Sequence, residues 1–146
     1  MRKYAVPLIA VLLVAVGLAG RYAGTAAGIA DPQPIVVVVV EETSQRPKLP
    51  KEQIVAMNSL SVRSWLFTHG SRLFLVDRDV VARDDKPPAA LVPFLDRAKG
   101  KKLPHMVIAN KAGKVLYDGD FPDNENLLMA LLQANYSVSE GTKLGD

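Results

Sequence analysis

A chain of 146 residues is long enough for one ordinary domain and too short for two. It has no cysteine, which excludes disulfide bonds, thiolate catalysis, cysteine-ligated zinc and iron–sulfur clusters. Its formal net charge is +3, and the first thirty residues account for it because they hold three basic residues and no acid. From Asp31 onward, 15 basic residues balance 15 acidic ones, so we expect no nucleic-acid partner for this part.

The N-terminal segment has the features of an export signal. Arg2 and Lys3 precede an uncharged apolar run over 4–20, and small residues follow as far as Ala30. This pattern predicts that residues 1–30 are a signal peptide or an uncleaved membrane anchor, and the sequence leaves the choice open. In both cases we expect the rest of the chain to be exported to the periplasm or another extracytoplasmic space. With an uncleaved anchor, its N-terminus would also hold it at the membrane.

The first elements expected beyond this segment are a buried strand and an interrupted helix. The run "PIVVVVV" (34–40) does not alternate with polar residues, which predicts a strand buried on both faces of a sheet. A polar loop over 41–50 follows, and Pro50 opens a helix. "MNSLS" (57–61) interrupts this helix, and its second piece ends at Gly70. The apolar sides of the two pieces are expected from Leu49, Ile54, Val55 and Met57, and from Val62, Trp65 and Leu66.

The middle of the chain is predicted to hold a second buried strand and a short helix. "RLFLVD" (72–77) is mostly apolar, and the charged stretch after it is expected to be a loop. Pro93 cannot lie deep inside a helix, because it lacks an N–H and clashes with the preceding turn. The helix should therefore start close to Pro93 and stop at Gly100. Its apolar stripe is expected from Leu91, Phe94, Leu95 and Ala98.

The last third of the chain is predicted to be a hairpin and a helix. "HMVIAN" (105–110) and "KVLYDG" (114–119) are the two strands, and Gly113 in the turn is placed for a positive φ. Asp123 is the expected N-cap of the helix. From Asn135 onward the chain is expected to be a polar, loose tail. The buried stripe of the helix is expected from Leu127, Leu128, Leu131 and Leu132.

The resulting order is β-α-β-α-β-β-α, with a proline immediately before the third strand. This order, together with "LPHMVIANKAGKVLYDG" (103–119), resembles the thioredoxin-like fold over residues 35–134. The resemblance implies an α/β domain over 31–136, with a mixed four-stranded sheet flanked by helices, and a flexible tail over 137–146. It also implies that the bond between Leu103 and Pro104 is cis.

The chain departs from this resemblance where the redox chemistry should be. Thioredoxin-like enzymes carry their reactive pair just after the first strand, and here that place holds "SQRP" (44–47), which cannot cycle electrons. We therefore expect no thiol–disulfide oxidoreductase activity, no catalytic residue and no cofactor.

No metal site is expected either, and both histidines have ordinary structural interpretations. "DRDVVARDD" (77–85) is similar to a calcium-binding loop, but Ala82 stands where the loop needs glycine and Pro88 where it needs glutamate. His69 is interpreted as a partly exposed residue at a helix end. His105 is interpreted as a surface histidine.

The leading functional hypothesis is a non-catalytic module that binds a protein or peptide. In the thioredoxin-like fold, the backbone before the cis proline is free to pair with an extended peptide. Here that residue is Leu103, beside Pro104. His105 and the polar loop over 43–48 would form the rim, in which Thr43, Ser44, Gln45 and Arg46 are singled out.

Two alternatives remain, and the identity of the partner is open. The first alternative is a structural component of a cell-envelope or virion assembly. The second is an enzyme of unrecognised chemistry. The partner is an unknown protein or peptide, with the membrane as a further contact through residues 4–20 if that segment is not cleaved.

Overall fold

The computed structural model describes residues 33–82 and 84–138, which form an α/β domain. The predictions for residues 1–30 lie outside this range, as does most of the expected C-terminal tail. The predicted order of strands and helices is confirmed, with one added 3-10 helix. In chain order, the elements are β1 (Ile35–Glu41), the 3-10 helix η1 (Thr43–Lys48), α2 (Lys51–Met57), α3 (Leu60–Thr68), β2 (Arg72–Asp77), α4 (Val92–Ala98), β3 (His105–Asn110), β4 (Val115–Asp120) and α5 (Glu125–Val138).

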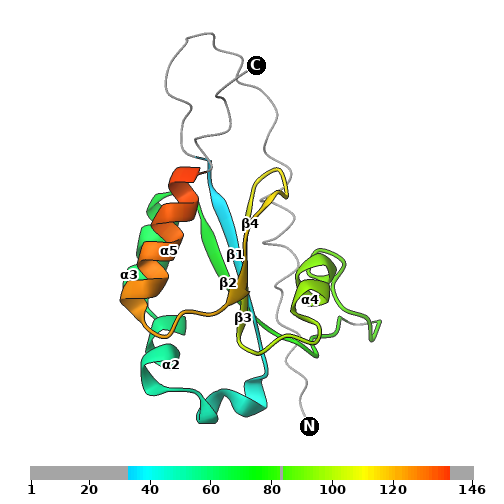
Figure 1. Ribbon diagram of the computed structural model, residues 1–146. Helices are drawn as coiled ribbons and strands as arrows, with labels where there is room; N and C mark the ends of the chain where they lie inside the picture. Colours follow the sequence, from blue (N-terminus) through cyan, green and yellow to red (C-terminus); the bar gives the residue numbers. More distant parts are fainter. Residues whose placement is uncertain (1–32, 83, 139–146) are drawn as a thin grey trace.

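The strands form one mixed four-stranded sheet in the order β2-β1-β3-β4. β1 and β2 are parallel, whereas β3 runs antiparallel to both β1 and β4. Figure 1 shows α2, α3 and α5 on one face of the sheet and α4 on the other. The prediction of a sheet flanked by helices on both faces is therefore confirmed.

β1 is central because its valine run is apolar on both faces. Ile35, Val37 and Val39 belong to the core beneath α2, α3 and α5, whereas Val38 and Val40 belong to the core beneath α4. Each of these side chains is at most 1% exposed. The prediction of a strand buried on both faces is confirmed, because a central strand covered on each side has no solvent face.

β2 has the predicted bounds, but only part of it is buried. Leu73 and Val76 are buried, Phe74 and Leu75 are half-buried, and Arg72 is exposed. The prediction of a buried strand is thus confirmed only in part, because β2 pairs with β1 alone and lies at an edge of the sheet.

The polar segment after β1 is more regular than predicted. Residues expected to form a loop instead form η1, whose turns are closed by hydrogen bonds such as that from Gln45 N–H to the carbonyl of Glu42 (2.9 Å). A short 3-10 helix is a common connector between a strand and an α-helix. It brings the side chains of this segment close to the carboxyl end of β1.

The apolar side of α2 differs from the prediction. Val55 is 51% exposed, whereas the polar Gln53 is buried. Gln53 tolerates burial because its Nε2 donates to the carbonyl of Phe121 at 3.0 Å, which satisfies the amide and ties α2 to the segment after β4. The predicted break before α3 is confirmed: Ser59 caps α3 by accepting a hydrogen bond from Val62 N–H (3.1 Å).

The end of α3 follows the predicted glycine cap. Gly70 has a φ of +65°, the N–H of Ser71 donates to the carbonyl of Leu66 (2.7 Å), and that of Gly70 to Phe67 (3.0 Å). These two bonds form a Schellman motif. The buried Ser71 Oγ also accepts a hydrogen bond from Ile35 N–H (2.9 Å), which fixes the start of β1 beside the end of α3.

α4 and the hairpin agree closely with the predictions. α4 begins at Val92, with Pro93 in its first turn, and Gly100 follows it with a φ of +73°. Gly113 has the expected positive φ of +80°, and the Leu103–Pro104 bond is cis, as predicted. β4 begins one residue later than predicted. The predicted stripe of α4 packs on the α4 face of the sheet through Leu91, Phe94, Leu95 and Ala98.

α5 corrects three details of the prediction. Its N-cap is Asn124, whose Oδ1 accepts from Leu127 N–H at 3.0 Å, and not Asp123. Leu127 is 54% exposed, whereas Leu128 and Leu132 are fully buried. The helix also continues past Asn135 to Val138, so the polar tail does not begin at Asn135.

Candidate functional site: a groove beside Pro104

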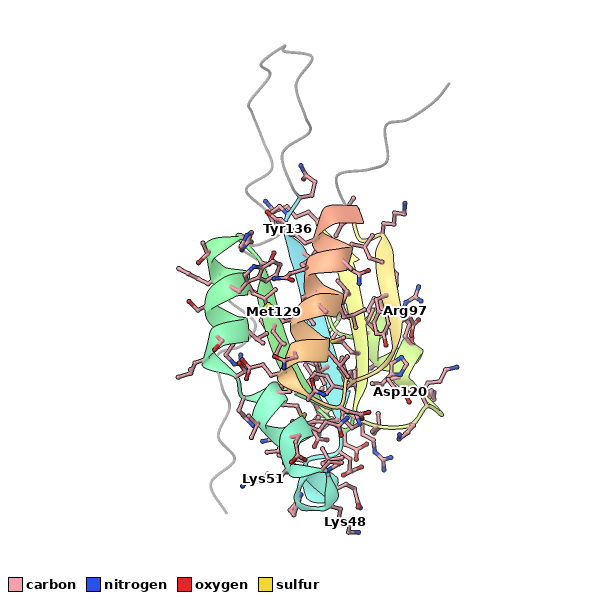
Figure 2. The ribbon with its side chains drawn as sticks, turned by 60° about the vertical axis from the view of Figure 1, so that its left-hand side comes forward. Lys48, Lys51, Arg97, Asp120, Met129 and Tyr136 are labelled. Atoms are coloured by element: carbon pink, nitrogen blue, oxygen red, sulfur yellow. The ribbon has the colours of Figure 1, made fainter. Side chains whose placement is uncertain are left out.

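A groove of about 450 Å³ opens where the carboxyl end of β1, η1 and the segment before β3 meet. In Figure 2, Lys48 marks this end of the domain, at the opposite end from Tyr136 of α5. The loop after β2 closes one part of the groove. Its lining residues are Glu41, Glu42, Gln45, Lys48, Leu49, Arg78, Lys101, Leu103 and Pro104.

The backbone beside the cis bond is held on one side and free on the other. The carbonyl of Pro104 accepts a hydrogen bond from Phe121 N–H at 3.1 Å, which ties the proline to the end of β4. By contrast, neither the N–H nor the carbonyl of Leu103 makes a hydrogen bond to any residue of the described ranges. Leu103 is half-buried and lines the groove, so its backbone groups can pair with an extended ligand.

A buried carboxylate forms part of the groove wall. The side chain of Glu41 is 3% exposed, and both of its oxygens accept from the guanidinium of Arg46, one of them from Nε at 2.9 Å. This hydrogen bonding to Glu41 raises the pKa of Arg46 above its ordinary value. The two-pronged pairing satisfies a carboxylate that would otherwise be costly to bury.

A second set of interactions holds η1 against the loop after β2. Glu42 pairs with Arg78 at 2.6 Å and accepts from Ser44 Oγ at 2.8 Å. Asp77 accepts from the N–H groups of Thr43 and Asp79, each at 2.9 Å. Burial opposes ionisation of Asp77, but these hydrogen bonds outweigh it and lower the pKa of Asp77.

The same acidic residues are the only described group that could hold a metal ion. One carboxylate oxygen from each of Glu42, Asp77 and Asp79 lies within 4.8 Å of the others. All three are already engaged, because Arg78 pairs with Glu42 and Asp79, and Asp77 accepts two backbone hydrogen bonds. The arrangement is accounted for by the structure of this loop.

The residues predicted for the binding site take different places around the groove. Gln45 lines the groove, together with Leu103 and Pro104. Thr43 and Ser44 lie beside it and stabilise η1 through the contacts described above. Arg46 supports the wall from behind through Glu41.

His105 is not a surface residue, which corrects its prediction. It is 3% exposed, because β3 is an inner strand and the side chain lies between the sheet and α4. Its Nε2–H donates to Asp118 at 2.7 Å, while Nδ1 is buried without a hydrogen-bond partner among the described residues. His105 therefore contributes to the packing under α4 and does not line the groove.

Asp118 connects His105 to α4. Its second oxygen accepts from Arg97 at 2.7 Å, so the carboxylate bridges a buried imidazole and an exposed guanidinium. The hydrogen bond from His105, aided by that from Arg97, lowers the pKa of Asp118 below its ordinary value.

His69 lies at the end of α3, as predicted, but packing explains its position better than charge does. Its ring stacks on Trp65 with centroids 4.3 Å apart and meets the edge of Tyr136 at 5.0 Å. Its Nδ1 lies 2.7 Å from the carbonyl of Trp65. This aromatic cluster joins α3 to α5 at the end of the domain away from the groove.

Several groove residues were missed by sequence reasoning. Glu41 and Glu42 were treated as part of a loop, and Lys101 follows α4. Arg78 comes from the charged segment after β2, and Leu49 directly follows η1. No local pattern brings these segments together. The parallel pairing of β1 with β2 does so, because it places both carboxyl ends at one edge.

Comparison of the chain with models of known families, with curated proteins and with solved structures finds no match. Among the helices of residues 33–82 and 84–138, none combines the length and apolar content needed to cross a membrane. The site must therefore be interpreted from its own geometry.

Proposed function

We propose that this chain is a thioredoxin-like protein without redox activity that binds a protein or peptide in the groove beside Pro104. We further propose that residues 1–30 export it or tether it to a membrane. The support for the fold assignment is the strand order β2-β1-β3-β4, the antiparallel hairpin and the cis bond directly before β3. The absence of cysteine excludes thiol chemistry.

The observation that carries the binding proposal is the free backbone of Leu103 inside a groove. An extended peptide entering the groove would pair with the Leu103 N–H and carbonyl, as an added strand pairs with a sheet edge. Gln45 at the rim offers further hydrogen bonds to such a ligand. Main-chain pairing supplies affinity and side-chain contacts supply selectivity.

A second candidate is a structural component that assembles through a packing surface away from the groove. Leu60 is 81% exposed and Phe67 is 73% exposed, and they lie seven residues apart on α3. This spacing places them on one side of the helix. Exposed apolar side chains grouped in this way are typical of protein contact surfaces.

One crosslinking experiment separates the two candidates. A photo-crosslinking residue is placed at Leu103 in one full-length variant and at Phe67 in another, in the cells that produce the protein. We expect a reproducible partner at position 103, lost when Gln45→Trp fills the groove from its exposed rim. Far-UV circular dichroism checks that each variant folds.

Two results would count against groove binding. Capture at position 67 alone would favour the structural candidate. Partner capture at 103 that survives both Gln45→Trp and Pro104→Ala would show that the contact does not use the groove.

A further inference from the structure

The charges that line the groove are unevenly paired. Both acidic residues have a guanidinium partner: Glu41 pairs with Arg46, and Glu42 with Arg78. Their negative charge is therefore already balanced from within the protein. Among the described residues that line the groove, a ligand therefore meets no unpaired carboxylate.

The two lysines of the groove are in the opposite situation. Lys48 ends η1 and Lys101 follows α4, so they reach the groove from separate parts of the chain. Both are exposed, and neither ammonium group has an ion pair or hydrogen bond within residues 33–82 and 84–138. Neighbouring Lys102, by contrast, lies 3.9 Å from the carboxylate of Asp120. The unbalanced charge of the groove is thus positive.

The remaining lining is partly apolar. Leu49 and Leu103 are half-buried, and Pro104, which also lines the groove, is buried. An extended ligand lying along Leu103 would rest an apolar side chain here while its neighbours reach toward solvent. Two lysines beside such a surface are complementary to carboxylates on the same ligand.

We propose that the ligand of this groove is an acidic peptide segment: an extended strand whose carboxylates meet Lys48 and Lys101 and whose apolar side chain packs on Leu49 and Leu103. This inference rests on the proposed function, since it names the class of peptide that the groove accepts. Selectivity against basic segments follows, because a lysine or arginine in the ligand would face Lys48 and Lys101 and find every groove carboxylate occupied.

The test is binding of labelled peptides to the full-length protein, followed by fluorescence anisotropy. Three peptides share one apolar pattern and differ only in carrying acidic, basic or neutral polar residues between the apolar ones. We expect the acidic peptide to bind most tightly, and its affinity to fall at raised salt. Lys48→Glu and Lys101→Glu should each weaken it about 1.5- to fivefold, the range for exposed ion pairs.

Lys111→Glu is the matched control, since Lys111 is exposed in the turn between β3 and β4, at the other end of the sheet. It makes the same change in net charge and should leave the affinity unchanged. If Lys111→Glu weakens binding as much as Lys48→Glu, the attraction is general and the inference is wrong.

The remaining outcomes separate this inference from the function on which it rests. If the three peptides bind equally, and Gln45→Trp abolishes binding, the groove binds peptides but the acidic preference is refuted. If no peptide binds to the folded protein, both proposals fail. If a free dicarboxylate competes as well as the acidic peptide does, the site binds a small anion and the peptide assignment is overturned.

Discussion

Glu41 ends the central strand with a carboxylate that is almost fully buried beside the groove. Among the described residues it pairs with one guanidinium, which belongs to η1, five residues later. The pair therefore links the core strand to the wall of the candidate site. A buried ion pair of this kind contributes little net stability, but removing one partner leaves a charge without compensation.

Arg46→Ala should destabilise the protein by about 3 kcal/mol, at the lower end of the usual range because Arg46 is itself 34% exposed. The measurement is the free energy of unfolding from urea denaturation. Arg78→Ala is the matched control, since it removes a more exposed guanidinium from the half-buried Glu42 and should cost less than about 1 kcal/mol. Equal losses in the two variants would show that Glu41 is not a buried charge.

Asp118 gives the fold a dependence on acidic pH. Its folded-state pKa is lowered by His105 and Arg97, below the value of about 3.9 for an unfolded chain. Asp118 therefore stabilises the protein above that pH, and the contribution is lost as the pH falls through the folded-state pKa.

Asp118→Asn should reduce the free energy of unfolding by about 1 kcal/mol at pH 7, because two charge-assisted hydrogen bonds are weakened. The difference from the wild type should shrink at pH values below about 3.9. Asp96→Asn, on the exposed surface of α4, is the control and should have little effect at either pH. A difference that stays constant into acid would mean that the carboxylate charge contributes nothing.

At the scale of elements, the packing of α5 shows that its surroundings decide which side of the helix faces the sheet. It contains two adjacent leucine pairs, and a single sequence cannot say which side faces the sheet. Leu128 and Leu132 are buried against the sheet, Leu131 packs at the margin, and Leu127 points to solvent. The sequence also did not predict that the helix continues through Asn135. In the structure, the Asn135 side chain donates to the carbonyl of Leu131 at 2.8 Å.

This orientation is testable with two like substitutions on one helix. Leu128→Ala should cost about 2–5 kcal/mol, because it removes a fully buried side chain from the larger core. Leu127→Ala, one residue earlier and 54% exposed, should change stability by less than about 0.5 kcal/mol. Thermal or urea unfolding compares them directly. Losses of similar size would place the apolar side of α5 elsewhere.

At the scale of the whole molecule, local patterns determined more of the fold than of the site. The valine run, the glycine after α3, the turn at Gly113 and the proline before β3 are each decided by neighbours in sequence. Such signals predicted the order of the elements and placed Leu103 and Pro104 at the groove.

What could not be predicted depends on contacts between distant segments. His105 was interpreted as exposed because its strand gives no alternation, and its burial follows only from the packing of α4 over β3. Pairing of Glu42 with Arg78 requires the parallel register of β1 and β2. Charged residues at loop ends show no sequence periodicity, so only the three-dimensional structure identifies their ion-pair partners.

The central position of β1 also bears on how the chain reaches its native state. In the native sheet Ile35 lies opposite Asn110 and Val40 opposite His105. β1 therefore cannot pair with β3 until residues far along the chain have been brought to it. Until then an uncharged run of valines, with high β-propensity and no proline, has one side open to pairing with other chains. During folding, the pairing of β3 with β1 therefore competes with aggregation through the open side of β1. Truncation before residue 105 removes β3, so aggregation should then predominate.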